Sequence, residues 1–147
     1  METFLTLPWF PDQRPVLTQG RVLNGRYVQF GLPGHNANDY AGMAIGTPLR
    51  ACHAGVVLAV GWDPNGYGRF VRLGAEWGET REAHGIIDSA SVVEGQRVEA
   101  GTVLMLLGAT GNIWHTDANG VAHQGDPRGA HLHIEVRLNV EVGSIWK

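Results

Sequence analysis

The chain has 147 residues, enough for one domain that buries roughly 68–70% of the surface its unfolded chain exposes, so its stability requires no covalent or metal cross-link. Eleven Lys and Arg residues against 14 Asp and Glu residues give a net charge of −3. This balance argues against sequence-independent binding to nucleic acid or to an anionic membrane surface. The single cysteine, Cys52, excludes an internal disulfide framework.

Neither a secretory signal nor a membrane span is evident in the sequence. The first ten residues carry the acidic Glu2, and Pro8 interrupts a very short apolar run, which is unlike a signal peptide. No run approaches the roughly 18 to 20 apolar residues of a transmembrane helix. We therefore expect a soluble protein without membrane insertion, and a monomer is favoured.

Glycine spacing predicts the fold class. The chain contains 21 glycines, which is about twice the average usage of roughly 7%, and they separate short apolar runs. Few stretches keep a helical period for eleven residues without Gly or Pro. The sequence therefore predicts an all-β single domain, with antiparallel sheets forming a groove.

The N-terminal part precedes the body of the domain. Residues 1–30 are expected to form a segment packed on the domain, which spans residues 31–147. Four aromatic residues of the segment are expected to pack rather than to bind a ligand: Trp9, Phe10, Tyr27 and Phe30.

Strands and turns follow at short intervals. Residues 47–60 read as two strands around Ala54-Gly55, and residues 66–73 give another strand after a turn. Residues 92–108 have the glycine punctuation of a hairpin leading into a buried strand. Residues 111–129 lack apolar periodicity and predict a long loop along one wall of a groove.

Two histidine motifs indicate a divalent metal site. Apolar and polar residues alternate over residues 130–137, so His131 and His133 project from one face of a strand. His35 and Asp39 lie among Gly and Pro residues, and their spacing suits a turn. A catalytic zinc site uses three His or carboxylate ligands and leaves a fourth position to water, and these motifs supply histidines to spare.

Read with Gly46-Thr47-Pro48, Asn65-Gly66-Tyr67-Gly68, Ala83-His84 and Gly95-Gln96-Arg97-Val98, these motifs resemble the LytM/lysostaphin-type zinc metallopeptidases of the M23 class, which cleave peptidoglycan peptides. The resemblance runs from about Gly34 to Arg137. It implies a fold of the LytM (duplicated hybrid motif) type with long loops around the metal. It also implies that bacterial peptidoglycan is the substrate, that one Zn²⁺ is bound by His35, Asp39 and His133, and that His84 and His131 are unligated catalytic histidines.

Two further residues are candidates for the site. Glu135 shares a strand face with His133 and could orient its imidazole, although a structural or solvated carboxylate is an equal alternative. Tyr67 could contact the substrate backbone, and packing is an equal alternative for it. The chain departs from the family pattern at Glu82 and Gly85, which flank His84, and at Ala37 in the HxxxD motif, where glycine is usual.

The remaining histidines, two loop aspartates and Cys52 are not expected to form a second site. Four residues of the long loop could form a second ion site or bind substrate, but a solvated loop is favoured: His115, Asp117, His123 and Asp126. Cys52 and His53 are consecutive in a predicted strand and point to opposite faces, so a Cys–His dyad between them is improbable.

The leading hypothesis is a zinc endopeptidase, and a non-catalytic wall-binding or regulatory module on the same fold is the alternative. A biotinyl or lipoyl carrier is excluded because the only lysine is Lys147. Helical zinc peptidases and GxSxG hydrolases are excluded because HExxH and GxSxG are absent. Action on the cell wall without a visible signal favours a bacteriophage lysin, released at lysis or carried on the virion.

Overall fold

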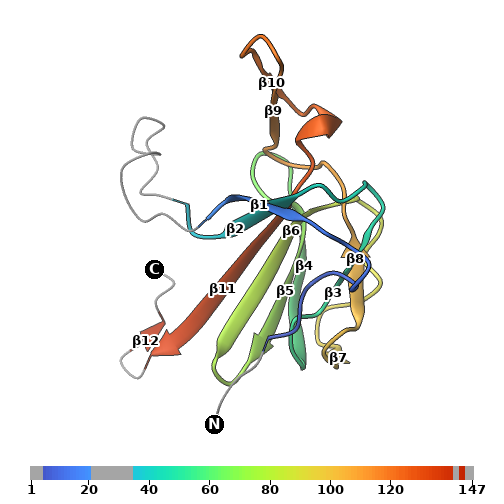
Figure 1. Cartoon of the computed structure of the whole chain (residues 1–147). Helices are drawn as coiled ribbons and strands as arrows, with labels where there is room; N and C mark the ends of the chain where they lie inside the picture. Colours follow the sequence, from blue (N-terminus) through green and yellow to red (C-terminus); the bar gives the residue numbers. More distant parts are fainter. Residues whose placement is uncertain (1–4, 21–34, 141–142, 145–147) are drawn as a thin grey trace.

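The computed structural model describes residues 5–20, 35–140 and 143–144, with side chains up to Leu138. Its framework is a large, open antiparallel sheet (Figure 1). The strands are, in spatial order, β1 (Val16–Gln19), β2 (Asn38–Ala41), β11 (Leu132–Val140), β6 (Gly78–Gly85), β5 (Gly68–Ala75), β4 (Gly55–Asp63) and β7 (Arg97–Val98), and β12 (Gly143–Ser144) pairs with β11. The all-β, antiparallel prediction is confirmed.

A short ribbon covers one face of this sheet. It pairs β3 (Pro48–Arg50) with β8 (Val103–Leu106), and its Leu49, Leu104 and Met105 are fully buried. They join Val57 and Leu73 from the large sheet in one apolar cluster. The core therefore lies between the sheet and the ribbon. Burial of each such leucine stabilises the fold by about 1.5–3 kcal/mol.

Most of the predicted strands are present, with one error of pairing. Residues 47–60 contain β3 and the start of β4, and the strand predicted at residues 66–73 is β5. The region 92–108 does end in a buried strand, β8. However, β7 and β8 do not pair with each other as a hairpin: β7 pairs with β4, and β8 pairs with β3. Glycine punctuation marks turns, but long-range packing chooses each strand's partner.

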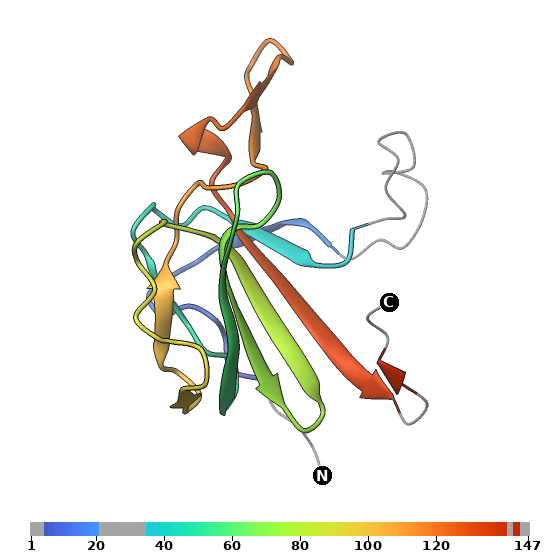
Figure 2. The same cartoon turned by 180° about the vertical axis from the view of Figure 1, so that it is seen from behind.

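The long loop predicted at residues 111–129 has structure of its own. It contains a hairpin of β9 (Trp114–Thr116) and β10 (Ala122–Gln124), followed by a 3₁₀ turn, η2 (Pro127–Gly129). Figure 2 shows this hairpin projecting from the end of the sheet where β11 begins. The prediction of a long loop therefore missed these two strands, because period-two alternation cannot be recognised in three-residue strands.

The N-terminal residues that the structure describes pack on the domain. The Thr6 amide donates to the Cys52 carbonyl at 2.8 Å, and the Arg50 amide donates to the Pro8 carbonyl at 2.9 Å. Trp9 is buried, whereas Phe10 is partly exposed beneath the Arg50 guanidinium. Tyr27, Phe30 and the boundary expected near residue 30 lie outside the described residues.

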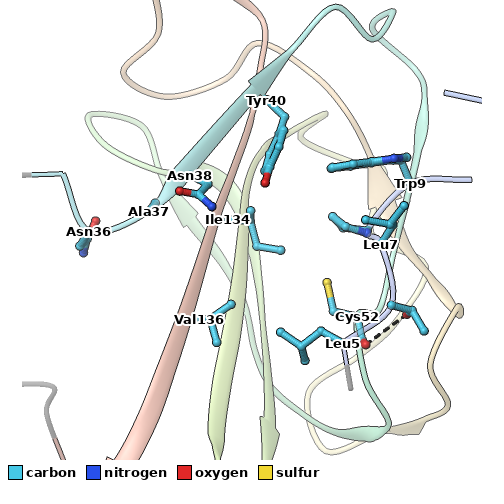
Figure 3. Close-up of a pocket in the computed structure, with 12 residues that line it drawn as sticks. Leu5, Leu7, Trp9, Asn36, Ala37, Asn38, Tyr40, Cys52, Ile134 and Val136 are labelled. Atoms are coloured by element: carbon cyan, nitrogen blue, oxygen red, sulfur yellow. Dashed lines mark hydrogen bonds between the residues drawn. The ribbon is translucent and has the colours of Figure 1, made fainter. Parts of the chain in front are cut away.

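An apolar pocket of about 310 Å³ opens on the back of β11. Figure 3 shows Ile134, Val136, Leu5 and Leu7 around it, with the Cys52 sulfur at its base. Since Ile134 and Val136 alternate with His133 and Glu135, the pocket and the histidines occupy opposite faces of the strand. None of the described residues forms a helix long and apolar enough to cross a bilayer.

Candidate metal centre

Strand pairing brings the two histidine motifs together. β2 and β11 are antiparallel neighbours, and Asp39 lies directly opposite His133. The Asp39 Oδ1 and His133 Nδ1 atoms are 2.9 Å apart. Asp39 is therefore on a strand rather than in the turn expected from the spacing. The register between β2 and β11 sets the distance from Asp39 to His133.

His35, which lies in the segment just before β2, completes this group. Its Nε2 lies 3.2 Å from Asp39 Oδ2, and its Nδ1 donates to the Gly20 carbonyl at 3.1 Å. Since a carbonyl can only accept, this bond places the proton on Nδ1 and turns Nε2 toward Asp39. The ligand atoms of His35, Asp39 and His133 all lie within 4.8 Å of one another.

Glu135 holds the far side of the His133 ring. Its Oε1 accepts from His133 Nε2 at 3.1 Å and from the Tyr67 hydroxyl at 2.8 Å. Its Oε2 accepts from Arg137 Nε at 2.7 Å, and Arg81 Nε lies 3.9 Å away. Glu135 is completely buried, so these donors are what make a carboxylate tolerable there.

The charges in the cluster are tightly coupled. Burial alone would raise the pKa of Glu135, but the hydrogen bonds from His133 and Tyr67 and the nearby Arg137 and Arg81 lower it to about 2. For His133, burial is outweighed by Asp39 and Glu135, which raise its pKa to about 9. Without a metal ion, both ring nitrogens of His133 therefore carry protons, and one of those protons bridges to Asp39.

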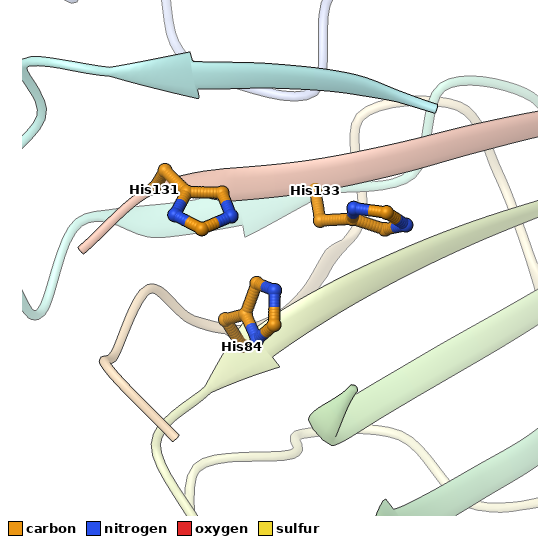
Figure 4. A group of neighbouring side chains, drawn as sticks. All are labelled: His84, His131 and His133. Atoms are coloured by element: carbon orange, nitrogen blue, oxygen red, sulfur yellow. The ribbon is translucent and has the colours of Figure 1, made fainter. Parts of the chain in front are cut away.

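His84 and His131 form a second imidazole pair beside this group (Figure 4). Their ring centroids are 4.7 Å apart, and that of His84 is 5.7 Å from that of His133. His84 Nδ1 donates to the Thr110 carbonyl at 2.8 Å, and His131 Nδ1 donates to the Gly129 carbonyl at 2.9 Å. Both rings are thereby anchored, with Nε2 as the nitrogen that bears a lone pair in the neutral form.

His84 is held in an unusual backbone conformation. Of the described non-glycine residues, it alone has positive φ, at 66°. The Tyr67 carbonyl accepts from its amide at 2.8 Å, and its carbonyl accepts from the Gly108 amide at 2.9 Å. Burial, and then the charge of His131, lower its pKa to about 3. Strain of this kind often marks functional positions, and here it turns the imidazole toward His131.

Tyr67 lies beside the histidines, with its ring centroid 5.6 Å from that of His133. Burial, together with its bond to Glu135, raises the pKa of the Tyr67 hydroxyl. The hydroxyl proton is therefore committed to Glu135, so any contact with a substrate would have to use the oxygen as an acceptor.

The four residues of the long loop that could have formed a second ion site do not converge on a common point. His123 Nε2 bonds to Asp117 Oδ2 at 2.8 Å on the exposed hairpin, and Asp126 pairs with Arg128. His115 faces His123 across the ladder. The described residues hold two groupings able to bind a metal, and neither includes these four residues.

Cys52 has no histidine base among its described partners. Its thiol donates to Glu82 Oε1 at 3.8 Å, and burial strongly raises the thiol pKa. His53 instead bonds to Ala54 and Thr80. These contacts exclude activation of Cys52 by His53.

Sequence reasoning missed the surroundings of Glu135 and the burial of Glu82. Arg81 stands opposite Glu135 on β6, and Arg137 is two residues further along β11. The alternation over residues 130–137 could have placed Arg137 on the face of Glu135. Nothing local could have identified Arg81, because its proximity depends on strand register.

Fold and site together define an antiparallel β protein with a candidate metal-binding centre. The model of peptidase family M23 matches residues 33–142, and the chain belongs to that family. No curated protein matches the chain in sequence.

Solved structures agree with this assignment. A zinc-containing peptidase from Vibrio cholerae is 27% identical, with a TM-score of 0.69 over 90% of this chain and 36% of that one. Lysostaphin, the antimicrobial peptidase from Staphylococcus simulans, is 26% identical, with a TM-score of 0.55 over 72% of this chain and 38% of that one. The catalytic domain of the prophage-encoded M23 protein EnpA from Enterococcus faecalis, solved as a mutant, shares the fold at 24% identity, with a TM-score of 0.65 over 94% of this chain and 91% of that one. This chain thus spans little more than a third of the first two proteins.

Proposed function

We propose that this protein is a zinc endopeptidase that hydrolyses peptide bonds in bacterial peptidoglycan, with one zinc ion bound by His35, Asp39 and His133. The observation that carries the proposal is the convergence of His35 Nε2, the Asp39 carboxylate and His133 Nδ1. Two imidazoles and a carboxylate are a ligand set of catalytic zinc sites, which leave a position open to water.

The chemistry of the donor set fits zinc. Each ligand imidazole has its other nitrogen bonded to an oxygen, Gly20 O for His35 and Glu135 Oε1 for His133. Such partners fix the tautomer and the ring orientation and make the ligand more basic. Where His133 Nδ1 shares a proton with Asp39, a cation would replace that proton, as metal ions do when they bind histidine.

His84 and His131 are proposed as the groups that move protons. A zinc ion, when bound, polarises the scissile carbonyl and lowers the pKa of its water toward about 7. As the water oxygen attacks the carbonyl carbon, one Nε2 lone pair of the imidazole pair accepts the water proton, and the same proton is returned to the leaving amine. Anchoring of both Nδ1 atoms on backbone carbonyls keeps these Nε2 atoms aimed at the site.

Glu135 is proposed to orient His133 rather than to react. It touches the ring nitrogen opposite Nδ1, and Tyr67 and Arg137 hold its two oxygens. Removal of such outer partners typically weakens metal binding by about 10–100-fold. Tyr67 therefore acts through Glu135, in addition to any role in the substrate groove.

The substrate assignment is supported by the kinship with peptidases. Family membership makes peptide hydrolysis the reaction class, and two structural relatives are described as a zinc-containing and an antimicrobial peptidase. The β9–β10 hairpin beside His131 is proposed to form one wall of the groove, where half-exposed Trp114 would contact the substrate.

The test is incubation of the purified protein with sacculi of different cross-link chemistry, followed by mass spectrometry of the released fragments. We expect peptide cleavage that a chelator stops and zinc restores. His35→Ala should lose both bound zinc and cleavage, whereas Glu94→Gln, which changes an exposed carboxylate outside the candidate centre and the hairpin, should keep both. Failure to release any chelator-sensitive product from any sacculus would contradict the peptidase and favour a wall-binding module.

The division of roles within the HxH motif has its own test. His131→Ala should retain zinc and lose cleavage, because His131 is proposed to transfer protons without binding the ion. Retention of both zinc and cleavage would refute this role.

The biological setting stays a prediction from the sequence. We propose a bacteriophage lysin that acts on the cell wall, either released at lysis or carried on the virion. Lysis or tail genes beside the coding sequence would support this setting, and a cellular operon for wall growth would refute it.

A further inference from the structure

We propose that a hollow on the large sheet, remote from the candidate metal centre, binds an uncharged sugar chain. Its consequence for cleavage rests on the proposed function, because peptidoglycan carries its peptides on sugar chains. The hollow has a volume of about 790 Å³ and lies around the turn that joins β5 to β6. Figure 2 shows this turn at the end of the sheet opposite the β9–β10 hairpin.

The hollow has an aromatic wall that is held in place. Trp77 lines it and is half-buried, with its ring centroid 4.8 Å from that of His53 at an interplanar angle of 68°. His53 is itself fixed, because its Nδ1 donates to the Ala54 carbonyl at 2.9 Å and its Nε2 bonds to the Thr80 hydroxyl at 2.9 Å. An indole fixed in this way can receive the C–H groups of a sugar ring on its electron-rich face without first being ordered.

The charged groups of the hollow balance one another. Arg72 donates to both carboxylate oxygens of Glu79, from Nε at 2.8 Å and from Nη2 at 3.0 Å, which leaves its Nη1 outside the pair. A neutral ligand with hydroxyl and carbonyl oxygens fits this set, whereas a polyanion would need an excess of positive charge. Two arginines and two glutamates line the hollow: Arg72, Arg97, Glu76 and Glu79.

Glycines leave part of the wall of the hollow without side chains. A Cβ atom at Gly74 would lie 2.8 Å from the Leu58 side chain, and one at Gly55 would lie 2.1 Å from the Gly74 carbonyl oxygen. Both glycines line the hollow. Glycine in a strand often marks a place where a ligand or another backbone approaches closely, and here it lets a flat ring lie against the sheet.

The hollow and the candidate metal centre share one face of the sheet. Across the β11–β6 ladder, Arg137 stands opposite Glu79, which lines the hollow. His133 lies on the same face as Arg137, because side chains four positions apart on a strand point the same way. Four positions of an antiparallel strand span about 14 Å. An extended peptide of about four residues covers the same length, so a sugar chain in the hollow can place its attached peptide at the metal centre.

The experiment is NMR titration of the isotope-labelled full chain with a linear tetramer of N-acetylglucosamine. This probe carries no peptide, so it reports binding alone. We expect the amide signals of Gly74 and Gly78 and the indole signal of Trp77 to shift in the wild type. Trp77→Leu and Arg97→Gln should each weaken binding by at least about 10-fold, because tryptophan and arginine side chains commonly dominate binding energy. Thermal melting checks folding, and Arg97→Gln, which changes an exposed residue, carries the test if Trp77→Leu does not fold.

Trp62→Leu is the matched control. Trp62 is 44% exposed, and the Arg69 guanidinium carbon lies 5.7 Å from its ring centroid. It too combines an indole with an arginine on the large sheet, but it does not line the hollow. This variant should bind the tetramer as tightly as the wild type does.

Cleavage assays then test the consequence. Trp77→Leu should lower the cleavage of sacculi more than the cleavage of a sugar-free peptide of the same sequence, because only sacculi present the sugar chain. Equal losses on the two substrates would refute a role of the hollow in cleavage.

The outcomes separate the sugar site from the proposed function. Absence of any shift with the tetramer, shifts confined to residues outside the hollow, or an equal loss of binding in Trp62→Leu would overturn the sugar site. Shifts at the hollow with a sugar-free peptide and none with the tetramer would also overturn it and assign the hollow to peptide. Absence of cleavage on every substrate would instead contradict the proposed zinc enzyme, and the NMR titration would still decide the sugar site.

Discussion

Glu82 should make the stability of the protein fall as the pH rises. Glu82 is 1% exposed, and its Oε2 has no hydrogen-bond partner among the residues that the structure describes. The contact with the Cys52 thiol at 3.8 Å is a weak compensation. Burial raises the pKa of Glu82 to about 8. The folded protein therefore keeps a proton on a group that the unfolded chain ionises above 4.5.

The direction and the size of the change in unfolding free energy with pH follow from this difference in pKa between the folded and unfolded states. Below 4.5 the carboxyl is protonated in both states and makes no pH-dependent contribution. Between 4.5 and about 8, only the unfolded chain gives up the proton, so each pH unit costs about 1.4 kcal/mol of stability. Above about 8 both states are ionised and the loss levels off, at about 5 kcal/mol as an upper bound.

Replacement of Glu82 by Gln removes the titration and keeps the shape. An amide donor left without a partner costs about 1–3 kcal/mol independently of pH, so the informative quantity is the slope of stability against pH and not its offset. Urea unfolding with a chelator present, at steps between about pH 5 and pH 8, gives the free energy of unfolding. We expect Glu82→Gln to gain several kcal/mol relative to wild type across this range.

Glu94→Gln is the matched control, because Glu94 is exposed and its variant should follow the wild-type pH curve. Parallel pH curves for Glu82→Gln and wild type would refute the reasoning, since they would mean that Glu82 titrates alike in the folded and unfolded states.

Three further changes test the structure elsewhere. Tyr67→Phe removes a donor to Glu135 and should weaken zinc binding by about 10–100-fold in chelator competition, beyond a loss of about 1–3 kcal/mol of metal-free stability; unchanged zinc affinity would count against Tyr67 as a support of the site. Gly111→Ala should destabilise the fold by more than about 1 kcal/mol in denaturant unfolding, because φ is +81° and a Cβ atom would lie 2.3 Å from the Gly66 carbonyl oxygen; wild-type stability would show that the two loops can separate. Leu104→Ala should cost about 2–5 kcal/mol in the same assay, because Leu104 is 1% exposed in the core, and a cost below this range would indicate collapse of the cavity.

Hydrogen bonds tie together the loops that lie beside His84. Thr110 accepts from His84 Nδ1 through its carbonyl, and its hydroxyl donates to the Gly85 carbonyl at 2.5 Å. The Asn112 amide donates to the Gly66 carbonyl at 2.7 Å, which ties this loop to the one that carries Tyr67. These bonds join chain segments on both sides of His84 and His131, and disturbance of either loop should change the geometry of this histidine pair.

Residue types and their spacing were sufficient to predict the all-β class, and the resemblance of the motifs to a known family predicted the membership of family M23. The same motifs predicted that His35, Asp39 and His133 lie together, as they do in the structure. The HxxxD and HxH motifs carry this information because ligand chemistry depends on which side chains are present. Strand alternation also placed Glu135 on the face of His133, where the structure has it bonded to the ring.

Only the tertiary structure decided how these side chains are used. Register put Asp39 opposite His133, and backbone carbonyls distant in sequence selected the ring nitrogens of His35 and His84. In the sequence Glu82 is marked only by its departure from the family pattern beside His84, and the structure shows that it is buried against Cys52. The physical reason is that protonation, tautomer and burial depend on neighbours brought together by strand pairing, and the spacing of residues along one strand does not contain that pairing.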